Sequence, residues 1–119
     1  MVMAERRKHK RYPIRMAAEG STSTGTMSVV VTEISTGGLR LHTSKSMTPK
    51  TPIDVIINIG RQIIFGGQIV WVIQKFDQKR AYYESGMEAD FISDQDDEVL
   101  YFRRLESLVQ EIVARTKVK

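Results

Sequence analysis

Six short runs of strand-like composition fill most of this chain, and no long helix can fit between any two of them. Each run is rich in β-branched and aromatic residues, and turn-forming residues such as Gly20–Ser23 and Thr48–Pro52 separate the runs. Parallel strands need a crossover connection of about a dozen residues or more, so the pattern predicts an antiparallel sheet. The runs cover residues 12–19, 26–34, 39–43, 53–59, 62–74 and 80–89.

The longest run contains the pair Gly66 and Gly67. Consecutive glycines weaken a flat strand, but they suit a bulge or a sharp bend where a barrel curves. Closing the sheet into a barrel also removes exposed strand edges. The sequence therefore predicts a mainly β fold of six antiparallel strands, arranged as a meander or as a barrel.

After Phe91 the apolar residues change their period to steps of three and four, which is typical of one face of a helix. We predict a C-terminal helix from about Asp94 to Arg115, with Ser93 as its N-cap and several acids in its first turns. Its apolar face can pack on the barrel or join a dimer, so the oligomeric state stays open. The face consists of Val99, Phe102, Leu105, Leu108 or Val109, and Ile112.

The chain has 119 residues, of which 41% are hydrophobic, and this is enough for one compact core. It contains no cysteine, which excludes disulfides, thiolate metal sites and cysteine nucleophiles. No apolar stretch approaches the roughly 18 residues of a membrane-spanning helix, and the first residues lack the apolar segment of a signal peptide. We therefore expect a cytoplasmic protein without membrane insertion.

The net charge of +4 comes from the first 11 residues, which carry five Lys or Arg and one acid. The rest of the chain is balanced, which argues against a broad face for duplex DNA, and no DNA partner is expected. Like charges without apolar periodicity indicate a flexible arm. The predicted organisation is a basic arm over 1–11, a barrel over 12–92, and a helical segment over 93–119.

Two motifs in the chain combine arginines with an acid, a hydroxyl and a glycine turn. Arg7 and Arg11 lie four residues apart, and the sequence Glu33-Ile34-Ser35-Thr36-Gly37-Gly38 follows 22 residues later at the end of a predicted strand. Guanidinium groups match both phosphate oxygens and the O6/N7 edge of guanine in a bidentate manner. The pair of motifs therefore predicts a site for a small anionic guanine nucleotide.

These motifs resemble the two signatures of PilZ domains, RxxxR at Arg7 and Arg11 and [D/N]xSxxG at residues 33–38. Residues 67–71 and 85–91 resemble later strands of the family, so the likeness spans residues 5 to 92. The resemblance implies a six-stranded barrel that binds cyclic di-GMP. It also implies control of motility, attachment or exopolysaccharide production through an unidentified downstream protein.

The resemblance assigns roles to single residues. Arg7 and Arg11 would grip a phosphate or guanine O6/N7, and the flexible arm would order around the nucleotide. Ser35 would supply a hydroxyl, and Gly38 would let the backbone approach the ligand. Arg6 either stacks on a second guanine or is another charge of the arm.

Trp71 has two interpretations. It alternates with Ile69 and Ile73 in a predicted strand, which favours a place in the core. Alternatively, it forms a stacking wall at the rim of the barrel, and it is kept as a secondary ligand candidate.

Glu33 departs from the signature, which has Asp or Asn at this position. A carboxylate can still accept the N1 and N2 protons of guanine, but its head moves outward by one methylene and an extra rotamer must be fixed. We expect weaker cyclic di-GMP binding. The alternative is a PilZ-like protein-interaction adaptor that has lost or weakened nucleotide binding.

Other chemistries lack support in the sequence. His9 and His42 have no second metal ligand at a recognisable spacing, and the acids between Asp94 and Glu98 lack the features of a calcium loop. No GxSxG or P-loop is present, so we predict a binding module without catalysis, metal or cofactor. A barrel for single-stranded nucleic acid remains a third interpretation, although aromatic residues are few.

Overall fold

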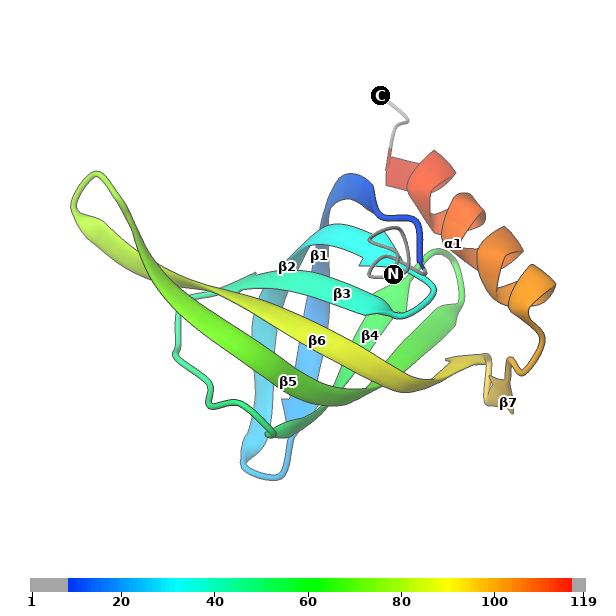
Figure 1. Cartoon of the computed structure of the whole chain (residues 1–119), viewed down its shortest axis with the longest axis horizontal. Coiled ribbons are helices and arrows are strands. Elements are labelled where there is room, and N and C mark those ends of the chain that lie inside the picture. The colour runs from blue at the N-terminus through cyan, green and yellow to red at the C-terminus, as the bar shows by residue number, and fades with distance from the viewer. Residues whose placement is uncertain (1–8, 117–119) are drawn as a thin grey trace, which may run out of the picture.

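The computed structural model describes residues 9–116, which form seven strands and one helix (Figure 1). Six strands form a closed antiparallel ring in the order β3-β2-β1-β4-β5-β6, because β3 also pairs with β6. The predicted six-stranded, barrel-like fold with a C-terminal helix is confirmed. The elements are β1 (Tyr12–Thr22), β2 (Gly25–Ser35), β3 (Gly38–Thr43), β4 (Pro52–Asn58), β5 (Gln62–Asp77), β6 (Arg80–Asp94), β7 (Asp97–Glu98) and α1 (Phe102–Thr116).

Alternate strand residues point into the ring and make one hydrophobic core. Phe65, Ile57 and Ile63 are the largest of these fully buried side chains on β4 and β5. The helix α1 adds its own buried side chains to the same core and contacts β1 and β2. These helix residues are Leu108, Val109, Ile112 and Val113.

The bend predicted at Gly66 and Gly67 is present. The register between β5 and β6 shifts there, because Gly66 pairs with Phe91 while Gly67 pairs with Ala89. A Cβ on Gly67 would overlap the carbonyl oxygen of Glu88. The glycine pair therefore allows β5 to approach β6 closely where the sheet curves.

The predicted start of the helix at Asp94 is wrong. Strand β6 continues to Asp94, which pairs with Asp97 across a two-residue turn. The turn residues Gln95 and Asp96 both have positive φ, 53° and 75°, as in a type I′ hairpin. The acids that suggested a helix start therefore lie in the end of β6, the turn and β7. The helix α1 begins at Phe102 with no acid in its first turn.

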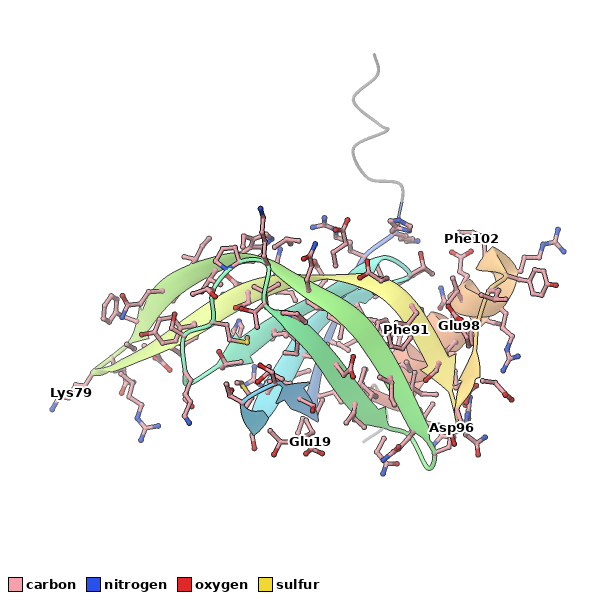
Figure 2. All side chains as sticks on the ribbon, turned by 90° about the horizontal axis from the view of Figure 1, so that it is seen from below. Glu19, Lys79, Phe91, Asp96, Glu98 and Phe102 are labelled. Atoms are coloured by element: carbon pink, nitrogen blue, oxygen red, sulfur yellow. The ribbon has the colours of Figure 1, made fainter. Side chains whose placement is uncertain are left out.

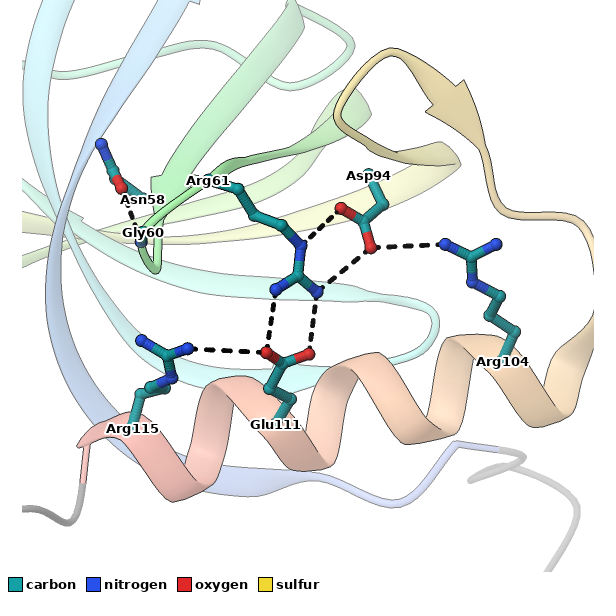
Figure 3. A network of polar contacts seen from close by, with 7 residues as sticks. All are labelled: Asn58, Gly60, Arg61, Asp94, Arg104, Glu111 and Arg115. Atoms are coloured by element: carbon teal, nitrogen blue, oxygen red, sulfur yellow. Dashed lines mark hydrogen bonds and ion pairs between the residues drawn. The ribbon is translucent and has the colours of Figure 1, made fainter.

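A dense polar cluster joins the sheet to the helix (Figure 3). Arg61, in the turn between β4 and β5, donates to Asp94 at 2.7 and 3.2 Å and to Glu111 of α1 at 2.9 and 2.8 Å. Arg104 also approaches Asp94, at 3.4 Å. These four residues, Arg61, Asp94, Arg104 and Glu111, are called the Arg61 cluster below, and they fix α1 against the end of β6.

The far end of the β5–β6 hairpin projects away from the ring and from α1 (Figure 1). Strand β5 pairs with β4 only over Gln62–Gln68, and its remaining residues pair with β6 alone. Within residues 9–116, α1 is too short and too polar to cross a membrane.

Candidate functional site

A cleft of about 460 Å³ lies on the outer face of β2, β3, β5 and β6, next to the turn between β2 and β3. Here Arg11 of the first motif meets residues 33–38 of the second. The cleft brings together five of the predicted site residues: Arg11, Glu33, Ser35, Gly38 and Trp71. The other two predicted residues, Arg6 and Arg7, lie outside the described residues.

A register shift in β2 turns Glu33 toward the cleft. Val29 and Val31 are buried at alternate positions, but the next buried residue is Ile34 rather than Glu33. The shift between β2 and β3 falls between Val31 and Glu33. Bulges of this kind re-aim side chains, so Glu33 faces outward although simple alternation would bury it.

A second register shift governs Trp71. It lies between Ile69 and Trp71 on β5, so that Ile69 is buried in the core while Trp71 is partly buried on the outer face. The indole ring covers Gly86 of β6, where any Cβ would collide with it. Trp71 therefore forms a wall of the cleft and is not a core residue.

Charged side chains of alternating sign cross the outer face from the cleft toward the hairpin. The Oε1 atom of Glu33 lies 3.6 Å from Nη1 of Arg11 and 3.6 Å from Nη2 of Arg40. Arg40 Nε is in turn 3.7 Å from Glu84, which Lys75 approaches to 3.1 Å. Glu33 is thus shared by one arginine from the end of the arm and one from the sheet.

The surroundings of Glu84 in this row of charged side chains favour its ionised form. Burial by itself raises the pKa of the Glu84 carboxyl, but Lys75, followed by Arg40 and His42, outweighs it and holds the pKa below the ordinary value. The lowered pKa favours the ionised form of Glu84, which pairs with the guanidinium of Arg40 beside the cleft.

Arg40 is a site residue that the sequence motifs do not include. Its ion pairs with Glu33 and Glu84 are too long for hydrogen bonds, and its buried Nε has no hydrogen-bond partner among residues 9–116. The guanidinium carbon lies 6.0 Å from the centre of the Trp71 ring. Strand alternation was the available signal, because Arg40 lies between the buried Leu39 and Leu41 and must face outward.

Ser35 and Gly38 shape the turn beside the cleft. The Ser35 hydroxyl accepts a hydrogen bond from the Gly37 amide at 3.1 Å and donates to the Gly38 carbonyl at 3.4 Å. A Cβ on Gly38 would overlap the carbonyl oxygen of Met87, so glycine is required for β3 to pair with β6. These contacts give both residues a structural role, while their contact with a ligand stays a prediction.

The first described residue lies over this turn. His9 Nδ1 is 2.7 Å from the Thr36 hydroxyl, and a Cβ on Gly37 would come within 2.6 Å of the His9 ring. Residues 9–11 therefore enter the cleft across a glycine that leaves room for the His9 ring. Across the described part of the chain, no group of His, Asp and Glu side chains is arranged to hold a metal ion.

The comparisons with known proteins agree with this geometry. No curated protein matched the sequence. The model of the PilZ domain, a family of cyclic di-GMP receptor domains, matches residues 5–110. This match covers the arm from residue 5, the whole ring and most of the helix, and it includes both signatures. The chain therefore belongs to the PilZ domain family.

Proposed function

We propose that this protein is a bacterial cytoplasmic cyclic di-GMP receptor that binds its ligand without catalysis. One observation carries the proposal: two arginines, Arg11 and Arg40, converge on Glu33 beside the exposed face of Trp71 in a single cleft. A flat aromatic wall, two forked cations and one carboxylate are the groups that a guanine nucleotide needs.

The roles follow from the chemistry of the ligand. A guanine base stacks on Trp71, and its N1 and N2 protons are donated to Glu33. Arg11 and Arg40 exchange their long ion pairs for short hydrogen bonds to phosphate oxygens or to guanine O6/N7. Micromolar affinity requires about 8 kcal/mol, and each charge-assisted bond contributes roughly 1.5 to 3 kcal/mol, so a few such bonds suffice.

Arg6 and Arg7 complete the proposed site from the arm. The contact of His9 with Thr36 supports this, because it brings the chain just after Arg7 to the rim of the cleft. Ordering of the arm on the nucleotide would create a new surface, and a protein partner that controls motility, attachment or exopolysaccharide production would respond to it. The ligand can shift this equilibrium only by its differential affinity for the ordered state.

Isothermal titration calorimetry with cyclic di-GMP tests the proposal. We expect binding to the wild type and a loss of about tenfold to a hundredfold in affinity for Arg11→Ala. Arg80→Ala, which changes an exposed arginine outside the cleft, is the matched control and keeps wild-type affinity. Absence of heat at high micromolar nucleotide, with folded wild-type protein, would contradict the proposal.

The second candidate is an adaptor of the same family that acts through protein contacts alone. It is favoured by the longer side chain of Glu33, which already neutralises both Arg11 and Arg40 at 3.6 Å. In that case the ion pairs of Arg11 and Arg40 with Glu33 stabilise the cleft, and the two arginines bind no nucleotide. The same titration separates the two candidates.

A further inference from the structure

Four large apolar side chains are exposed together where β6 passes through β7 into α1. Their exposed fractions are 40% for Phe91, 70% for Leu100, 77% for Tyr101 and 54% for Phe102. We call these four residues the aromatic patch. Monomeric proteins rarely expose contiguous large apolar side chains, and such surfaces mark interaction sites.

Strand pairing brings the members of the aromatic patch together. The amide of Val99 donates to the carbonyl of Ile92 at 2.8 Å, which continues the β6–β7 ladder and sets Leu100 opposite Phe91. Tyr101 and Phe102 follow directly at the start of α1, and Phe91 and Phe102 lie on the same side of the molecule (Figure 2). The members of the patch come from two segments that meet at the end of the β6–β7 ladder.

Local packing holds the aromatic patch in place before any partner arrives. The Phe91 ring covers Gly66, where a Cβ would collide with it. The Tyr101 carbonyl accepts the amide of Leu105 at 3.0 Å and so fixes the first turn of α1. A preformed surface binds without the entropic cost of ordering it.

The charges around the aromatic patch select the kind of partner. Residues 86–104 contain six acids and two bases, Arg103 and Arg104, of which Arg104 lies 3.4 Å from Asp94, so acids predominate around the patch. Asp94 is buried and paired with Arg61, but the other acids are exposed around the patch. An acidic rim repels nucleic acids and anionic lipid surfaces, and it attracts basic protein segments. These exposed acids are Glu88, Asp90, Asp96, Asp97 and Glu98.

We propose that the aromatic patch docks a protein segment that carries apolar side chains flanked by Lys and Arg. The docking itself needs no nucleotide, and as the surface for a downstream partner it rests on the proposed receptor function. The two sites are close along β6, since Glu88 and Ala89 line the cleft and Phe91 belongs to the patch.

The test uses the full chain and a fluorescent, short amphipathic peptide built of Leu and Lys at helical spacing, with a Leu and Glu peptide of the same pattern as its counterpart. Fluorescence anisotropy should show that the wild type binds the Leu and Lys peptide at least about tenfold more tightly than the counterpart. The double variant Tyr101→Ser, Phe102→Ser should weaken binding about tenfold, as expected for aromatic anchors.

Controls separate the apolar and charged contributions. The double variant Ile73→Ser, Phe76→Ser removes exposed apolar side chains from the β5–β6 hairpin and should leave peptide binding unchanged. The triple variant Asp96→Asn, Asp97→Asn, Glu98→Gln keeps the aromatic patch and should weaken binding and its dependence on salt. Circular dichroism of each variant checks that the fold is retained.

Several outcomes would overturn the proposal. If both peptides bind equally well, the aromatic patch does not select basic segments. If the Tyr101 and Phe102 variant binds the peptide as well as the wild type does, the patch is not the docking site. A dimer in sedimentation that this variant abolishes assigns the patch to a second copy of the chain. Binding to phosphatidylglycerol vesicles through the same side chains assigns it to membranes. Each of these measurements can be interpreted even if the protein does not bind cyclic di-GMP.

Discussion

Two arginines of this protein face pairs of carboxylates in opposite ways. Arg61 makes four hydrogen bonds of 2.7 to 3.2 Å to Asp94 and Glu111, whereas Arg40 meets Glu33 and Glu84 only in ion pairs of 3.6 and 3.7 Å. An arginine whose guanidinium donates several short hydrogen bonds to the protein stabilises the fold. An arginine held in place by charge alone keeps its donors for another molecule.

The protonation chemistry of the Arg61 cluster supports this contrast. The hydrogen bonds that Arg61 donates to Glu111 and then to Asp94 raise the pKa of Arg61 and lower the pKa of both carboxyls. The cluster therefore remains fully charged under ordinary conditions. Substitutions in the two regions should separate stability from binding.

The largest effect is expected for Asp94→Asn. Asp94 is only 9% exposed, and the change removes the charge that Arg61 and Arg104 share while it keeps the side-chain shape. We expect Tm to fall by about 5 to 10 °C in differential scanning calorimetry, with cyclic di-GMP affinity preserved. The neighbouring exposed Asp96→Asn is the control. An unchanged Tm would mean that the Arg61 cluster does not fix α1.

Arg40→Met should give the reverse result. Loss of its guanidinium should lower cyclic di-GMP affinity about tenfold, because one charge-assisted contact is lost while the stem still packs on Trp71. Its Tm should stay within about 2 °C of the wild type, since no hydrogen bond to residues 9–116 is broken. Arg61→Met is the matched variant, and it should lower Tm and spare affinity. Equal effects of the two changes would remove the contrast.

Acid titration sharpens the same comparison. The lowered pKa values of Asp94 and Glu111 mean that these groups stabilise the fold above their unfolded pKa of about 4, and that this contribution is lost as pH falls through the folded values. Tm should therefore hold steady down to about pH 5 and then decline. Asp94→Asn should show a shallower decline. A parallel curve for this variant would contradict the role of Asp94.

The smallest effect is expected for Glu33→Asp. A shorter carboxylate fixes one rotamer fewer and loses its reach to Arg40, which frees that arginine for the nucleotide. Calorimetry should show cyclic di-GMP affinity about threefold tighter and Tm nearly unchanged. Weaker binding would show instead that the extra methylene of Glu33 is needed to hold Arg11 and Arg40 together.

Strand positions were predictable because alternation reports burial directly. The six runs and the glycine bend at Gly66 and Gly67 follow from local chemistry, and each predicted run matches an observed strand. The site motifs were also recognisable, since Arg11, Glu33 and Ser35 have both the residue types and the spacing of a known signature.

Other features depend on contacts between distant segments and could not be predicted. Register shifts at Glu33 and Trp71 reverse which face a residue occupies, and only the partner strand determines them. The predicted helix start was wrong because a cluster of acids occurs both at helix N-termini and in tight hairpins. Asp94 became part of the hairpin because Val99 pairs with Ile92 across the sheet.

Strand β6 carries Gly86 and Glu88 at the cleft, Phe91 at the aromatic patch and Asp94 at the Arg61 cluster. Removing one residue from its middle would rotate everything beyond that point to the wrong face and damage three regions at once. The hairpin tip at Gln78 projects away from the ring and from α1 (Figure 1), and loop tips accept added sequence readily. A reporter for live imaging or a purification tag is therefore best inserted there.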